Sequence, residues 1–116
     1  MDDFSEAQKL FIEFQNTHKW SVLAEALDIL DELVQRDDRK RAENLKGTID
    51  RFMKNEWKQI VEKYNIHDFQ SPTNDLLSLL GNSATEDDLE RVLGIIGYRV
   101  RVNNSLDFFD ENKYRP

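Results

Sequence analysis

Apolar residues recur every three or four positions along most of this 116-residue chain, and few residues interrupt that spacing. The chain holds only two prolines and four glycines. Side chains three and four positions apart share one face of an α-helix, and the many Leu, Glu, Lys, Arg and Ala residues favour that structure. The sequence therefore predicts an all-α fold without a β-sheet: a compact bundle of four to five helices in a single helical domain over residues 1–116.

The first two helices are expected to follow each other closely. The first should begin near Asp3, and the second should run from about Trp20 to about Arg36. Ser21 or Thr17 is the candidate N-cap of the second helix, because a side-chain hydroxyl can accept a hydrogen bond from a free backbone N–H.

The third helix is expected to be long and to cover residues 38–64, with Asp37 or Asp38 as its N-cap. At 1.5 Å per residue it would measure roughly 40 Å. Gly47 is its weakest point, because glycine in a helix interior costs about 1 kcal/mol relative to alanine.

A short apolar helix is predicted over about residues 71–80, where Pro72 suits the first helical position and Gly81 suits a C-terminal stop. Ser83 and Glu86 then have the spacing of a capping box, which marks the start of the last helix.

The segment that follows could be a strand or a helix. Tyr98, Val100 and Val102 alternate with polar residues, which is typical of a strand. Helical spacing, however, accounts for ten apolar residues between positions 89 and 109, whereas alternation accounts for three. A lone two-stranded hairpin would also be marginal in water. We therefore predict one long C-terminal helix over about residues 86–111.

The apolar residues of this last helix fall on two roughly opposite faces. The first face carries Leu89, Val92, Leu93, Ile96 and Val100. The second carries Ile95, Tyr98, Val102, Leu106 and Phe109. Small bundles leave one side of each helix in water, so the second face is either the core side of a central helix or a contact with another chain. Because aromatic residues favour interfaces, these five residues are the candidate partner-binding residues.

Basic charge gathers in the middle of a chain whose net charge is −7. Residues 38–64 hold eight Lys or Arg against five Asp or Glu, and acidic segments lie on both sides. The candidate contacts with phosphate or with an acidic partner are Arg36, Arg39, Lys40, Arg41 and Lys46. The segment either pairs internally with its acidic neighbours or contacts nucleic acid, which an acidic protein otherwise repels.

The sequence holds no local motif for catalysis or for metal binding. Loops that cradle phosphate, zinc-binding helix motifs and calcium loops do not occur in it, and it has no cysteine. His18 lies at a helix junction, where a structural role suffices, and His67 lies beside Asp68 in an expected loop. We expect no catalytic residue, no cofactor, no metal and no small-molecule substrate.

These features favour a small, acidic, non-enzymatic protein–protein interaction module that binds a partner protein or a second copy of itself. By size and class alone, such proteins include inhibitors, immunity proteins, antitoxins and accessory subunits. The alternative is a nucleic-acid-associated adaptor that contacts phosphates through residues 36–58. Glu6 and Glu13 argue against a signal peptide, and no apolar run approaches the ~20 residues that span a membrane. Zero cysteine fits a cytoplasmic protein.

Overall fold

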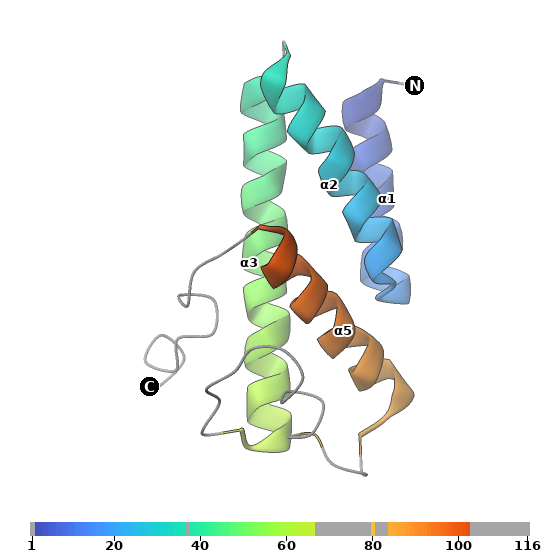
Figure 1. Ribbon diagram of the computed structural model, residues 1–116, viewed down its shortest axis with the longest axis vertical. Coiled ribbons are helices and arrows are strands. Elements are labelled where there is room, and N and C mark those ends of the chain that lie inside the picture. The colour runs from blue at the N-terminus through green and yellow to red at the C-terminus, as the bar shows by residue number, and fades with distance from the viewer. Residues whose placement is uncertain (1, 37, 67–79, 81–83, 103–116) are drawn as a thin grey trace. The chain divides into compact units, whose positions relative to one another are not determined.

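A computed structural model of the chain describes residues 2–36, 38–66, 80 and 84–102. Its helices are α1 (Asp3–Thr17), α2 (Trp20–Gln35), α3 (Arg39–Tyr64) and α5 (Glu86–Arg101), shown in Figure 1. The described residues contain no strand. The all-α prediction is therefore confirmed, as is the long third helix of 26 residues.

Contacts between residues group the chain into two units, Met1–Phe52 and Met53–Pro116. Helix α3 supplies residues to both units. Each unit is described by itself below, and the assignment of residues 1–116 to one domain stays a prediction.

In the first unit, α1 and α2 form a helical hairpin with a connection of two residues, His18 and Lys19. His18 adopts the left-handed conformation, with φ 59°, and its backbone N–H donates to the Phe14 carbonyl at 2.6 Å. Its ring also meets the Phe14 ring edge-on, with the centroids 6.3 Å apart. His18 thus ends α1 and has the structural role expected at this junction.

The N-cap predicted for α2 was wrong. The left-handed residue reverses the chain at once, so Lys19 takes the extended N-cap position, and it makes no side-chain cap bond. Ser21 already lies inside the helix. Thr17 instead accepts a hydrogen bond from the Lys19 backbone N–H at 3.3 Å. The start of α1 near Asp3 is confirmed, and Asp2 caps it by accepting from the Ser5 backbone N–H at 2.8 Å.

The core of the first unit forms from the apolar stripes of its helices, and Phe52 meets the rings of Phe11 and Phe14 edge-on at 5.5 and 6.3 Å. Edge-to-face aromatic pairs contribute about 0.5–1.5 kcal/mol beyond the burial of their area. The buried apolar residues of this unit are Ala7, Leu10, Phe11, Phe14, Leu23, Ala26, Leu27, Leu30, Leu33, Ala42 and Ile49.

In the second unit, α5 begins at Glu86, as predicted, but its N-cap is Thr85 and not Ser83. The Thr85 hydroxyl accepts a hydrogen bond from the Asp88 backbone N–H at 3.1 Å. The helix continues without a break to Arg101, so the segment that could have been a strand is helical there. The remainder of the predicted helix, residues 103–111, lies outside the described residues.

The core of the second unit lies between α5 and the second half of α3, which run beside each other in Figure 1. Most of the predicted short helix over residues 71–80 lies outside the described part of the chain, but its last residue, Leu80, is buried. The buried apolar residues of this unit are Met53, Trp57, Ile60, Ile66, Leu80, Val92, Ile95 and Tyr98.

Candidate protein-contact site

The two apolar faces of α5 differ in exposure. On the predicted partner-binding face, Ile95 is 0% and Tyr98 3% exposed, so both belong to the core of the second unit. Val102 is half-buried, and Leu106 and Phe109 lie outside the described residues. A binding role for this face stays a prediction, but a partner could reach Ile95 and Tyr98 only if the unit opened.

Part of the opposite face of α5 is accessible, although Val92 on that face is buried in the core. Leu93 is 46% and Val100 59% exposed. Ile96 lies between these two residues on the helix, and Leu89 lies one turn before Leu93. Both are half-buried. We name these four residues the α5 stripe. Their spacing of four, three and four positions is that of the seam along which two helices pack.

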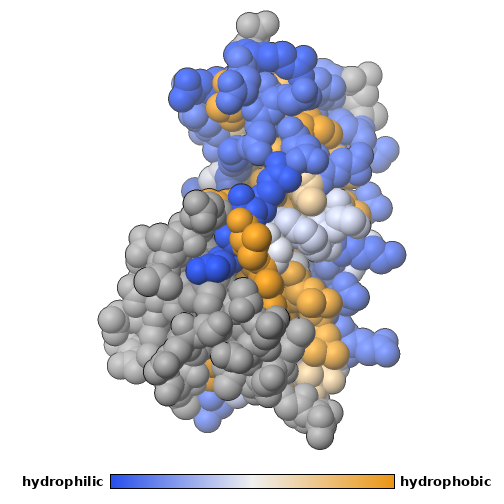
Figure 2. Space-filling model, viewed as in Figure 1, coloured by the Kyte–Doolittle hydropathy of each residue, from blue (hydrophilic) through white to orange (hydrophobic). Residues whose placement is uncertain are grey.

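Apolar side chains are visible on the surface along α5. Figure 2 shows hydrophobic residues gathered along the course that α5 takes in Figure 1. Isolated exposed apolar residues are common on proteins, and Ile12, 59% exposed on α1, is one of them. Contiguous apolar patches are less common and mark sites of interaction.

Charged residues at the two ends of α5 have opposite signs. Its first turn holds the acidic residues Glu86, Asp87 and Asp88, and Glu90 follows as an exposed side chain. Its last turn holds Arg99 and Arg101. This order complements the helix dipole, and it also leaves the α5 stripe with an acidic end and a basic end.

An almost completely buried carboxylate fixes which side of α5 faces α3. Asp88 is 1% exposed, and it accepts hydrogen bonds from Lys63 Nζ and from the Tyr64 hydroxyl, both at 2.6 Å. Arg91, one turn further along α5, donates to the same carboxylate at 3.2 Å. A buried charge without partners would be costly, so these donors hold Asp88 in the interface between the helices.

Burial by itself would raise the pKa of Asp88, but the hydrogen bonds from Lys63 and Tyr64 and the attraction to Lys63 outweigh it and lower the pKa to about 2. Asp88 is therefore ionised at neutral pH. Its negative charge is the form that binds Lys63 and Arg91, so the contact between α5 and α3 is intact under ordinary conditions.

Arg91 extends the same network to a second acid on α3. Its guanidinium forms an ion pair with Glu56 and donates to Gln59 Oε1 at 2.7 Å. The side chains of Arg91 and Glu56 are only 13% and 10% exposed, so this pair is shielded from solvent. Together with Asp88, it orients α5 so that the α5 stripe points away from α3.

Asp88 is not one of the candidate residues that the sequence predicts. A signal for its burial was present, because Asp88 shares a helical face with Val92 and Ile95, at four and seven positions further on. Both of these apolar residues are buried. An acid in phase with core residues, with an arginine three positions on, indicates a buried ion pair.

Four of the five candidate phosphate contacts form ion pairs with carboxylates of the same chain. Arg36 binds Asp3 at 2.9 Å, and Lys46 binds Asp31 at 2.7 Å. Arg39 binds Glu43 at 3.0 Å, and Arg41 binds Asp38 while lying 4.4 Å over the Phe4 ring. Lys40 is exposed. The pattern agrees with internal pairing of the basic segment.

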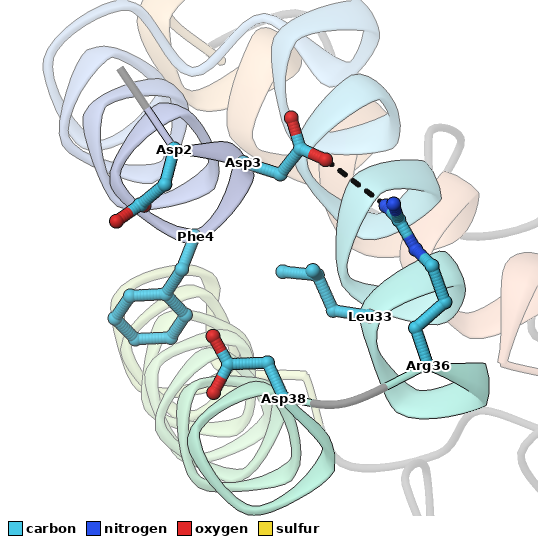
Figure 3. Close-up of a pocket in the computed structure, with 6 residues that line it drawn as sticks. All are labelled: Asp2, Asp3, Phe4, Leu33, Arg36 and Asp38. Carbon is cyan, nitrogen blue, oxygen red and sulfur yellow. Dashed lines mark hydrogen bonds and ion pairs between the residues drawn. The ribbon is translucent and has the colours of Figure 1, made fainter.

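A shallow hollow of about 240 Å³ lies at the start of α1 in the first unit, lined by acids and by Arg36, as Figure 3 shows. Its carboxylates already have donors within the chain: Asp2 accepts from Ser5, Asp3 from Arg36, and Asp38 from Arg41. The hydrogen bond from Arg41 also lowers the pKa of Asp38. The lining residues are Asp2, Asp3, Phe4, Leu33, Arg36 and Asp38.

Within the described ranges, no group of three or more His, Cys, Asp or Glu side chains is placed to hold a metal ion. None of the helices described is both long enough and apolar enough to cross a membrane. Comparison with known protein families, with curated proteins and with solved structures found no match to this chain. The function is therefore argued from the residues alone.

Proposed function

We propose that this chain is a non-enzymatic protein–protein interaction module and that the α5 stripe is its contact surface. The observation that carries the proposal is the exposure of Leu93 and Val100 on a helix whose other side is fixed in a core. These two exposed apolar side chains lie two turns apart, with the half-buried Ile96 between them and the half-buried Leu89 one turn before Leu93, which is the pattern with which one helix recognises another.

Covering the α5 stripe favours binding, and because Leu93 and Val100 are 46% and 59% exposed, each contributes about half of the value for a fully exposed side chain. Complete burial of a leucine or valine side chain that was exposed contributes about 1.5–3 kcal/mol. Because Asp88 and Arg91 already hold α5 in place, little ordering of the helix remains to oppose binding. The stripe is thus a preformed surface.

The alternative, an adaptor that contacts nucleic acid through residues 36–58, has no comparable observation in its favour. Phosphates would have to displace the carboxylates that already bind Arg36, Arg39, Arg41 and Lys46. A cytoplasmic setting is part of the proposal and rests on the absence of cysteine.

Photo-crosslinking tests the proposal. A photoreactive amino acid is placed at position 93 or, as a matched control, at position 12 on α1, and each protein is irradiated in an extract of its native cell. We expect an intermolecular adduct from position 93 and none from position 12. Excess unlabelled wild type should suppress the adduct, and excess Leu93→Lys should not. Equal adducts from both positions, or equal suppression by both competitors, would contradict the proposal.

A further inference from the structure

We propose that the partner of the α5 stripe is a second copy of this chain, whose α5 packs antiparallel across a two-fold axis. This inference rests on the proposed function and names the partner of the same surface. It is argued from the charge order along α5 and from the spacing of the stripe.

The α5 stripe is suited to pairing with itself. A two-fold contact uses the same patch on both copies, so each residue at one end meets a residue from the other end. In an antiparallel pair centred on the stripe, Leu89 lies against Val100 of the second copy, and Leu93 lies against Ile96 of the second copy. The exposed and half-buried residues of each copy therefore cover one another.

The charges distinguish the two directions of packing. A parallel pair would place Glu86 and Glu90 beside the same acids of the second copy, and Arg101 beside a second Arg101. An antiparallel pair brings the acidic end of each helix to the basic end of the other. Like charges that face each other destabilise an interface, whereas opposite charges fix its direction. The order of charges therefore selects the antiparallel arrangement.

One ion pair follows from this geometry and occurs twice. Glu90 and Arg101 are eleven positions apart on α5, which places them on the same flank of the stripe about three helical turns from each other. In an antiparallel pair the two-fold axis brings equal flanks together, so Glu90 lies within two residues, about 3 Å along the helix axis, of Arg101 of the second copy. Arg101 already interacts within its own chain, but a guanidinium has five N–H donors and can bind a further carboxylate.

Sedimentation velocity of the purified full chain at low salt tests the self-association. We expect wild type to change from monomer to dimer as its concentration rises. Leu93→Lys places two positive charges in the centre of the contact and should weaken the dimer at least about tenfold. Ile12→Lys, which changes an exposed apolar residue of α1, should match wild type. Circular dichroism checks that each variant remains helical.

A charge exchange tests the direction. Glu90→Arg alone and Arg101→Glu alone should each weaken the dimer about tenfold, and the double variant should recover most of the loss. A parallel pair predicts no such recovery, so a double variant as weak as the single ones contradicts the antiparallel arrangement. Dimerisation that Leu93→Lys leaves unchanged would overturn the inference, because the dimer would then use another surface.

A purified wild type that stays monomeric at every concentration would also overturn the inference. The proposed function would then be decided separately by the cross-link at position 93. An adduct with the mass of a different protein would keep the α5 stripe as a contact surface. An adduct within one chain would mean that the chain itself covers the stripe, and both proposals would fail.

Discussion

Asp88 is the residue on which the orientation of α5 depends. Its carboxylate meets Lys63, Tyr64 and Arg91 at distances of 2.6, 2.6 and 3.2 Å in a place that is almost free of solvent. Removing one member of such a buried network leaves the other charges without compensation, and this loss exceeds what the intact network contributes.

We therefore expect Asp88→Asn to lower the free energy of unfolding by about 2–3 kcal/mol, as measured by urea denaturation at pH 7. Glu86→Gln, two residues earlier in the same turn, removes an exposed charge near the helix dipole and should cost no more than about 0.5 kcal/mol. Equal effects of the two substitutions would mean that Asp88 acts only on the dipole.

The lowered pKa of Asp88 also predicts a dependence of stability on pH. The pKa of Asp88 is about 2 in the folded chain, below the ordinary aspartate value of 3.8 that applies in the unfolded chain, so the carboxylate stabilises the fold above about pH 4. As the pH falls from 4 to 2, wild type should lose about 2 kcal/mol from this group. Asp88→Asn has no carboxylate at this position. Between pH 4 and pH 2, the unfolding free energy of the variant should therefore fall by about 2 kcal/mol less than that of wild type. Parallel pH profiles would contradict the assigned pKa.

At the scale of the element, apolar periodicity was sufficient to place the described helices. It located the start of α1 near Asp3, the extent of α2 and α3, and the continuation of α5 through Gly97. Periodicity depends on the chain alone, because a helix repeats every 3.6 residues whatever it packs against.

Periodicity could not decide which apolar face of α5 lies inside. Two opposite faces have the same spacing, and the choice depends on contacts with α3 that are distant in sequence, above all those of Asp88 and Arg91. The caps were missed for a related reason. The hydroxyls of Ser21, Ser83 and Thr85 are chemically similar, and the path of the preceding loop decides which one reaches a free N–H.

Gly47 allows a prediction about the stability of helix α3. It lies within α3, and a Cβ atom added there would meet Arg51 at 3.6 Å, an ordinary van der Waals distance. Gly47→Ala should therefore raise the free energy of unfolding by up to about 1 kcal/mol, because alanine loses less backbone entropy in a helix. Thermal denaturation measures the change. A lower melting temperature would show that α3 needs glycine at this position.

At the scale of the whole molecule, the net charge of −7 and the internal pairing of the basic segment predict weak interaction with nucleic acid. We expect no shift of a labelled DNA duplex or single strand in a gel at 50 mM salt. A salt-dependent shift that Arg39→Ala and Arg41→Ala together reduce would instead favour the adaptor function.

The central claim is that the α5 stripe is a contact surface that becomes covered when two chains meet. The chain has no cysteine, so a single cysteine in place of Leu93 or, as a control, Ile12 reports the accessibility of one site. The most direct measurement is the rate at which each thiol reacts with a maleimide as the protein concentration is raised. The predicted result is a rate that falls with concentration at position 93 and stays constant at position 12. A rate at position 93 that is as constant as the rate at position 12 would contradict the claim.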